Sequence, residues 1–240
     1  MVTIKKKRFI FTLTETWFGY KFKWSNLFLP SCYLGLRKQI FYNGVKTTTE
    51  TAMLPLNLSM DELYNNFSSS HKRYIKKAQA EGVQCYFNRD RSQFIEFYNK
   101  FAKRKGLYTL NTNKLKDFSG LEWIYFYASL NGQQLVAHSY IEDKEKGIVR
   151  LMESASLRLD DRYDAGQIAR ANKLLHCITI KYFKECGCLE YDFGGWQNQQ
   201  GLLEFKQSFG AAPLKVFNYY TLPYYFNRQL KKIAATIKRK

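Results

Sequence analysis

Two arginines beside an expected helix start form a candidate phosphate site. Arg158 and Arg162 lie just before Asp164 and Gly166, where a long helix is expected to begin. The first backbone N–H groups of a helix have no partner within the helix, and guanidinium groups bind phosphate oxygens well. We therefore expect Arg158, Arg162 and Gly166 to hold the phosphates of a cofactor or donor. The alternative is that the arginines pair with the aspartates at 160, 161 and 164 on a solvated loop.

The elements that would position this site form a strand meander followed by a crossover. Three segments with strand periodicity, separated by Asn131-Gly132 and Lys146-Gly147, predict antiparallel strands over residues 123–130, 134–142 and 148–156. A helix over residues 165–186 and a strand over 189–193 then predict a parallel pair, which gives a mixed sheet. Ligands bind near the point where strand order changes, here between the strand ends at Ser156 and Phe193.

The sequence also predicts helices and strands outside this meander and crossover. The capping box Ser59–Glu62 starts a helix that ends at Glu81-Gly82. Further helices are expected over 92–105 and 202–209, and further strands over 83–87 and 214–222. The first 50 residues have the weakest pattern, with short strands over 8–13 and 39–42. Without an internal repeat or a linker, the sequence predicts one compact domain with an N-terminal extension.

Residues 191–210 contain the most informative motif. The sequence reads YDFGGW at 191–196 and GLLEFKQSFG at 201–210, and a basic helix, SHKRYIKKAQAEGV, precedes it at 70–83. This ordered set resembles the FemAB-like branch of the GNAT N-acyltransferase superfamily over about residues 50–220. The resemblance implies an α/β (α+β) fold, with a GNAT-like mixed, mostly antiparallel sheet that has a parallel splayed pair and is flanked by helices.

The same resemblance divides the chain into three parts. Residues 1–58 are an N-terminal extension, interpreted as the remnant of a first GNAT-like half, and residues 59–222 are the acyltransferase domain. Residues 223–240 are a basic amphipathic helix. This helix could lie on an anionic membrane surface or pack on the N-terminal strands with its lysines in water.

The activity implied by the resemblance is transfer of an acyl group from an activated donor to an amine. The amine must lose a proton, and the oxyanion of the intermediate needs a donor or cation nearby. Asp192 is a candidate base or amine-orienting acid, and Glu153, on the neighbouring strand, is the other. Lys206, in the FK position of the family motif, is implied to place a charge on the acyl carbonyl or on a substrate phosphate.

Each of these roles has a structural alternative. Asp192 could only hold the turn at Gly194 through backbone hydrogen bonds. Glu153 could pair with Arg150 or Lys173, and Lys206 could be a solvated helix residue.

The substrate is expected to meet aromatic and basic side chains. Tyr163 and Trp196 flank the expected cleft and could line an acyl or sugar pocket, and Arg73 of the basic helix is a third substrate-binding candidate. Aromatic core packing is the alternative for Tyr163 and Trp196. His138 and His176 are expected to be packed, neutral histidines rather than catalysts.

The donor has two candidates. Acyl-CoA is marginally favoured because the chain holds only one complete domain of this type. The coenzyme A loop of the superfamily, however, is not reproduced around Gly166, because one extra residue precedes that glycine. Aminoacyl-tRNA, used by FemAB enzymes to build peptidoglycan cross-bridges, is the second donor. The acceptor is expected to be an amine of a small molecule or of a glycan or cell-envelope precursor.

Charge distribution supports an anionic partner. The chain has 38 Lys and Arg against 20 Asp and Glu, a formal charge of +18 that is concentrated at its two ends. A non-catalytic protein that binds RNA or anionic lipid is therefore an alternative of another class. The 5 cysteines are odd in number and irregularly spaced, so neither a disulfide framework nor a metal site is expected. We expect a cytoplasmic protein, with peripheral contact to the inner face of a membrane as an option.

Overall fold

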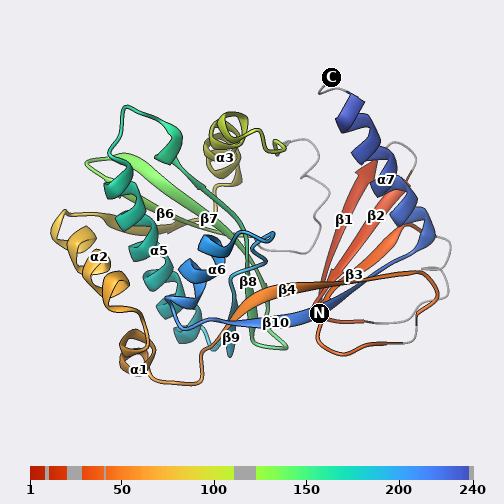
Figure 1. The fold of residues 1–240 in the computed structure, drawn as a ribbon, viewed down its shortest axis with the longest axis horizontal. Helices are drawn as coiled ribbons and strands as arrows, with labels where there is room; N and C mark the ends of the chain where they lie inside the picture. Colours follow the sequence, from red (N-terminus) through yellow and green to blue (C-terminus); the bar gives the residue numbers. More distant parts are fainter. Residues whose placement is uncertain (9–10, 21–28, 41, 111–122, 238–240) are drawn as a thin grey trace. The chain divides into compact units, whose positions relative to one another are not determined.

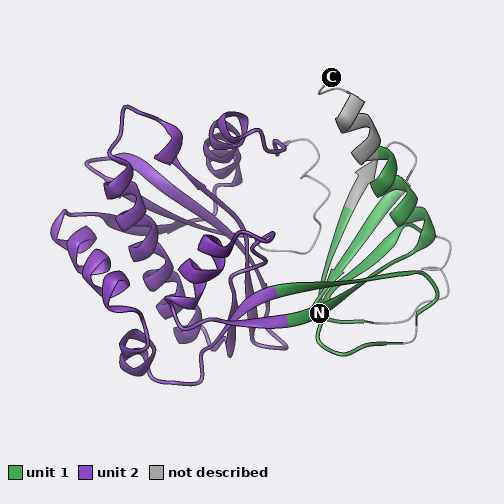
Figure 2. Cartoon of the chain, viewed as in Figure 1, with its two compact units in different colours: residues 1–50, 113–121, 215–240 green, residues 51–112, 122–214 purple. Residues whose placement is uncertain are grey.

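The computed structural model of the chain describes residues 1–8, 11–20, 29–40, 42–110 and 123–237 (Figure 1). The chain divides into two compact units (Figure 2). Unit 1 comprises residues 1–50, 113–121 and 215–240, and unit 2 comprises residues 51–112 and 122–214. Unit 1 thus joins the N-terminal segment to the C-terminal one. The domain boundaries expected after residues 58 and 222 stay predictions.

Unit 2 contains a mixed sheet whose strands follow the order β4-β9-β8-β7-β6-β5. Their bounds are β4 (Val45–Pro55, of which 51–55 lie in unit 2), β5 (Gln84–Asn88), β6 (Ile124–Leu130), β7 (Gln133–Asp143), β8 (Ile148–Ser156) and β9 (Glu190–Asp192). The pair β8–β9 is parallel, and every other neighbouring pair in this order is antiparallel. The predicted meander and the predicted parallel pair are therefore confirmed.

The turn between β6 and β7 forms where the Asn-Gly signal predicts it. Asn131 and Gly132 have φ angles of 50° and 76°, values that the short polar side chain of asparagine and the absent side chain of glycine tolerate. This turn fixes the register of β6 on β7, in which Phe126 lies opposite His138.

The helices of unit 2 are α1 (Met60–Asn65), α2 (Ser69–Ala80), α3 (Arg91–Lys105), α5 (Ala165–Glu185) and α6 (Gln200–Gln207), with a 3-10 turn η2 (Leu157–Leu159) before α5. The capping box at Ser59 and Glu62 is confirmed. The single helix expected from Ser59 to Glu81 is wrong, because the Ser68 hydroxyl accepts the His71 amide at 3.2 Å and starts a second helix there.

Two apolar clusters lie on the two faces of this sheet. Neighbouring residues of a strand point to opposite faces, and Tyr125 joins the cluster of α3 whereas Phe126 joins the cluster of α2 and α5. The larger cluster includes Ile75 of α2, Leu175 of α5 and Phe209 after α6. The parallel pair β8–β9 thus has α5 and α6 on one face.

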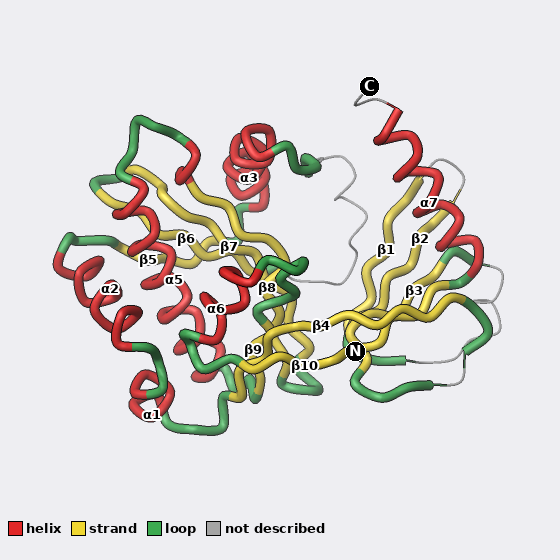
Figure 3. Tube along the Cα trace, viewed as in Figure 1, coloured by secondary structure: helices red, strands yellow, loops and turns green. Residues whose placement is uncertain are grey.

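Unit 1 contains β1 (Val2–Arg8), β2 (Phe11–Trp17), β3 (Ser31–Leu36), the end of β10 (Ala212–Tyr220) and α7 (Leu222–Ile237). The pairs β1–β2 and β3–β10 are antiparallel, and β2–β3 is parallel. Helix α7 lies beside β3 (Figure 3). Strand alternation buries Val2 and Ile4 of β1.

Two sequence predictions in unit 1 differ from the structure. Of the strand expected over residues 8–13, residue 8 ends β1, residues 11–13 begin β2, and residues 9 and 10 lie outside the described residues. The basic residues after Ile4 obscure the alternation of β1 in the sequence. The strand expected over 39–42 is absent at residues 39, 40 and 42, and residue 41 lies outside the described residues. The Ile40 amide donates to the Tyr219 hydroxyl at 2.9 Å instead of to a neighbouring strand.

The expected fold class is confirmed. The ten described strands pair in both directions, helices flank the sheet of unit 2, and the parallel pair follows the meander as the motifs predict. Among the described helices, none is both long enough and apolar enough to cross a lipid bilayer.

Candidate functional site

Asp192 ends β9 and is the centre of a buried polar cluster. Its register partner on the parallel strand β8 is Arg150, whose guanidinium donates to the Asp192 carboxylate. The hydroxyl of Thr51, on β4, and the amide of Gly194, at 2.8 Å, also donate to this carboxylate. Asp192 is only 2% exposed. Its oxygens are thus engaged by a cation and two neutral donors, which anchors the strand end.

Lys206 completes this cluster from α6. Its Nζ donates to the carbonyl oxygens of Gly194 and Gly195, at 2.7 Å each. The side chain is 4% exposed, so the alternative of a solvated helix residue is wrong. Burial lowers the pKa of Lys206 to about 8; the Asp192 charge opposes this shift and the Arg150 charge adds to it. Two of its three ammonium protons are used by the turn.

The backbone at Gly194 needs glycine. Its φ angle is +76°, which lies in the left-handed region. A Cβ atom there would lie 3.6 Å from the Leu151 carbonyl oxygen, an ordinary contact, so conformation rather than space selects glycine. The turn after β9 is therefore set by Gly194, by Asp192 on its amide and by Lys206 on its carbonyl.

Glu153 lies on β8 opposite Ser139 and contacts a different set of residues. Its carboxylate accepts a hydrogen bond from the Tyr108 hydroxyl, and Tyr98 of α3 is its second neighbour. Burial, followed by the Glu153 charge, raises the pKa of Tyr98 above its ordinary value. Glu153 is partly exposed on the strand that also supplies Arg150. Its carboxylate thus lies beside the hydroxyl groups of two tyrosines.

The candidate phosphate cradle is occupied by protein carboxylates. The Gly166 amide donates to Asp164 at 2.7 Å, so the helix start is already capped by an anion. Arg162 donates to Asp160 through Nε and a terminal nitrogen, and Arg104 of α3 donates to the same carboxylate at 2.7 Å. These hydrogen bonds lower the pKa of Asp160. For Arg162 the structure thus shows the alternative pairing, and phosphate binding here stays a prediction.

The three substrate-binding candidates lie in different surroundings. Trp196 is 9% exposed and belongs to the larger apolar cluster, as its core alternative predicts. Tyr163 donates its hydroxyl to Gln133 at 3.2 Å. Arg73 is exposed on α2, with its guanidinium over the Tyr74 ring. Among the predicted site residues, only Asp192 and Lys206 share a partner in the described contacts, because both side chains hydrogen-bond to the backbone of Gly194.

A second polar network ties β9 to α5 on the opposite face. The Tyr191 hydroxyl lies 2.8 Å from that of Tyr140 and 3.2 Å from Nδ1 of His176. His138 lies beside His176, with 4.3 Å between ring centroids, and 2.9 Å from Asn172. Burial lowers the pKa of His138 to about 4 and that of His176 well below its ordinary value. The prediction of packed, neutral histidines is confirmed.

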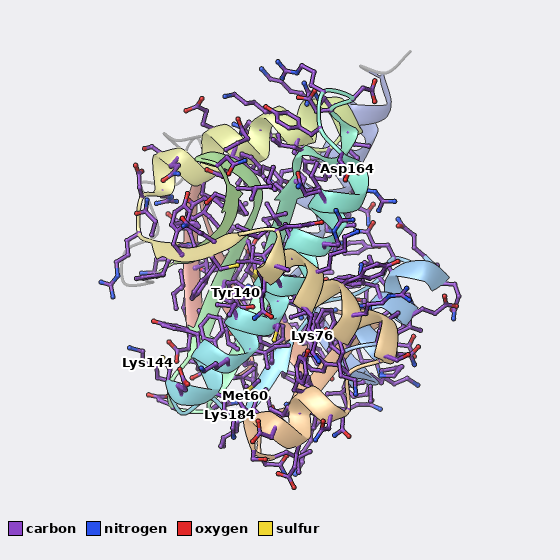
Figure 4. All side chains as sticks on the ribbon, turned by 90° about the vertical axis from the view of Figure 1, so that its left-hand side faces the viewer. Met60, Lys76, Tyr140, Lys144, Asp164 and Lys184 are labelled. Carbon is purple, nitrogen blue, oxygen red and sulfur yellow. The ribbon has the colours of Figure 1, made fainter. Side chains whose placement is uncertain are left out.

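The two ends of α5 have different surroundings (Figure 4). Asp164 marks its start, Lys184 lies in its last turn, and Tyr140 lies between them. A cavity of about 320 Å³ is found near the Lys184 end, with Lys144, Tyr182, Cys186 and Cys188 among its lining residues. None of the predicted site residues lines it, so this cavity is separate from the Asp192–Lys206 cluster.

Sequence reasoning missed Arg150 and Thr51. The sequence indicates Arg150 only as a partner of Glu153, although a lone arginine in the apolar run of β8 is a signal for a buried charge pair. Thr51 lies two residues before Met53, which pairs with Asp192, and only strand register reveals this proximity.

Comparisons with known proteins identify the fold. No family model and no curated protein matches the chain. Among solved structures, FemX aligns with a TM-score of 0.62 and 14% identity, over 94% of this chain and 85% of that one. The C-terminal domain of a putative lysylphosphatidylglycerol synthetase from Agrobacterium fabrum aligns with a TM-score of 0.62 and 7% identity, over 91% and 80%. The L-PGS of Bacillus licheniformis aligns with a TM-score of 0.54 and 8% identity, over 88% of this chain and 74% of that one. The TM-scores establish a fold shared with FemX and with the two lysylphosphatidylglycerol synthetase structures.

Proposed function

We propose that this protein is a transferase that moves an aminoacyl or acyl group from an activated donor to an amine, as FemAB-like enzymes do. The observation that carries the proposal is the parallel pair β8–β9, whose end is fixed by Arg150, Asp192 and Lys206 around a glycine turn. This arrangement coincides with the motif that resembles the FemAB-like branch. The fold shared with FemX and with the lysylphosphatidylglycerol synthetase domain supports the same class.

The proposed chemistry is an aminolysis. The acceptor nitrogen attacks the carbonyl carbon of the donor ester, a C–N bond forms, and the C–O bond to the donor breaks. The nitrogen proton passes to a base and then to the leaving oxygen. Glu153 is the proposed base, because its carboxylate is partly exposed and accepts a hydrogen bond from the Tyr108 hydroxyl. Asp192 and Lys206 are positioning residues that hold the backbone of residues 194 and 195.

Aminoacyl-tRNA is the donor that the contacts favour. Coenzyme A in the wider superfamily is held by backbone amides before the long helix, whereas here Asp164 caps that helix and Asp160 engages Arg162. A pyrophosphate at this place would face two carboxylates. The formal charge of +18 suits a polyanionic donor.

Donor choice is tested by two measurements on the full chain at moderate salt. Filter binding compares a pool of aminoacylated tRNA with the same pool after deacylation, and we expect the charged pool to bind more tightly. Thermal unfolding compares acetyl-CoA with adenosine diphosphate, and we expect equal, small shifts. A ligand at about 100 times its dissociation constant stabilises by about 2.7 kcal/mol, so true binding is easily seen. A shift with acetyl-CoA alone would establish the coenzyme A alternative, and equal binding of both tRNA pools would favour a non-catalytic RNA-binding protein.

A further inference from the structure

Helix α7 of unit 1 exposes an apolar stripe. Leu222, Phe226 and Leu230 are 53%, 62% and 67% exposed. Their spacing of four residues places them along one side of the helix. The sequence continues the same helical spacing with isoleucines at 233 and 237. Solvent-facing residues of a packed helix are normally polar, so this stripe is a candidate docking surface.

The other side of α7 packs against the strands of unit 1 through tyrosines. The Tyr224 hydroxyl donates to Glu15 of β2 at 2.8 Å, and Glu15 is buried. The rings of Tyr224 and Tyr225 lie 5.8 Å and 6.5 Å from the ring of Tyr220, and the exposed Arg228 guanidinium lies 5.1 Å from the same ring. Leu222 and Phe226 are each two residues from Tyr224, which places them on the far side of the helix. Helix α7 therefore packs tyrosine rings and the Tyr224 hydroxyl against the strands of unit 1 and leaves Leu222, Phe226 and Leu230 exposed.

The net charge of unit 1 indicates which kind of partner the stripe binds. Unit 1 contains 18 lysines and arginines and 3 acidic residues, which leaves +15 of the chain's +18. Two copies of such a unit repel each other, which disfavours a dimer through this face. RNA would satisfy the charge but offers no apolar layer for the leucines and the phenylalanine. An anionic bilayer offers both phosphate headgroups and an acyl layer.

We propose that the exposed stripe of α7, at Leu222, Phe226 and Leu230, docks unit 1 on an anionic lipid surface. The apolar side chains enter the boundary between headgroups and acyl chains, and basic residues of unit 1 contact lipid phosphates. This inference does not depend on the proposed transferase activity.

The test is co-sedimentation of the full chain with lipid vesicles. Vesicles of phosphatidylcholine are compared with vesicles that contain roughly one-third phosphatidylglycerol, and the anionic vesicles should bind at least about tenfold more protein at low salt. Raising the salt should weaken this binding, because lipid phosphates are screened. Replacing Phe226→Ser together with Leu230→Ser should weaken it by about tenfold or more, because the apolar contribution is lost.

A matched control variant replaces an exposed leucine outside the stripe. Leu189 of unit 2 is 61% exposed, so Leu189→Ser should leave vesicle binding unchanged. Thermal melts followed by circular dichroism check that each variant folds. The comparison of neutral with anionic vesicles uses the unchanged protein and therefore tests the proposal even if a variant fails to fold. Equal binding to both vesicle types would overturn the proposal. Unchanged vesicle binding by the folded double variant would also overturn it. The same holds if the unchanged protein forms a dimer that dissociates in the double variant, or if it binds an RNA oligomer and the double variant does not.

Discussion

Asp192 and Lys206 bind the two polar backbone groups of one residue, Gly194. The carboxylate of Asp192 accepts the Gly194 amide at 2.8 Å, and Nζ of Lys206 donates to the Gly194 carbonyl at 2.7 Å. Residues from β9 and α6 thereby fix the chain where the parallel strands end. The same cluster contains Arg150, so a buried anion is balanced by two cations.

Replacing Lys206→Met should destabilise the fold. The carbonyl of the buried Gly194 loses its donor, which costs about 1–3 kcal/mol in the free energy of unfolding. Urea denaturation measures this loss. Lys181→Met is the matched control, because Lys181 is more than half exposed and pairs only loosely with Glu185 at 3.8 Å. Equal stability of the two variants would contradict a structural role for Lys206.

Glycines 194 and 201 should respond oppositely to alanine. Gly194→Ala forces an L side chain to a φ of +76° and should cost about 1–2 kcal/mol. Gly201 lies in α6 with open space around its Cα, so Gly201→Ala should be neutral or stabilise by up to about 1 kcal/mol. Melting temperatures of the two variants give the sign directly. A Gly194→Ala variant as stable as the unchanged protein would show that the turn adopts another conformation.

Acid should destabilise the protein through its buried histidines. Burial, with the Lys173 charge, lowers the pKa of His71 from 6.5 to about 4 in the folded state. Below pH 6.5 His71 is protonated in the unfolded chain but stays neutral in the folded chain. The free energy of unfolding therefore falls as the pH falls toward 4. The loss for His71 between pH 7 and pH 5 is about 2 kcal/mol.

The variant His71→Phe isolates this effect. The new ring keeps the contacts with Phe205 and Phe209 but does not titrate. Unfolding free energies at pH 7 and pH 5 should therefore differ less in the variant than in the unchanged protein. The same pH dependence in both proteins would assign the acid sensitivity to other groups.

Local signals predicted much of unit 2. Gly106, with a φ of 67°, ends α3 where the helical pattern stops, and the hairpin and the crossover follow their turn and periodicity signals. The break at Ser68 was missed because the apolar spacing continues through it. A serine that caps a helix looks in sequence like any polar surface residue.

The site was predicted in part. The motif located Asp192 and Lys206, and the structure brings them together, but their contacts match an anchoring role more closely than a free base or charge. Arg150 and Thr51 complete the cluster through the register of β8, β9 and β4. Register depends on long-range pairing, which no local pattern encodes.

Glu153→Gln should remove transfer activity while the fold persists. Glutamine can still accept the Tyr108 hydrogen bond, but it does not take up the amine proton, so the rate should fall by about 100-fold or more. Single-turnover transfer from charged tRNA measures this. Glu96→Gln, on the exposed face of α3, is the control and should keep the full rate. Equal rates for both variants would remove Glu153 from the proposed chemistry.

The most direct test of the account is transfer itself. A pool of tRNA charged with radiolabelled amino acids is incubated with the full chain, a lysine-containing peptide and glucosamine, and mild alkali then separates labile esters from stable amides. If the protein is an aminoacyl transferase, label should appear in an alkali-stable amide, and faster than in the absence of the protein. Label that leaves the tRNA only at the rate without protein, while acetyl-CoA labels the same amines, would contradict aminoacyl transfer by this site.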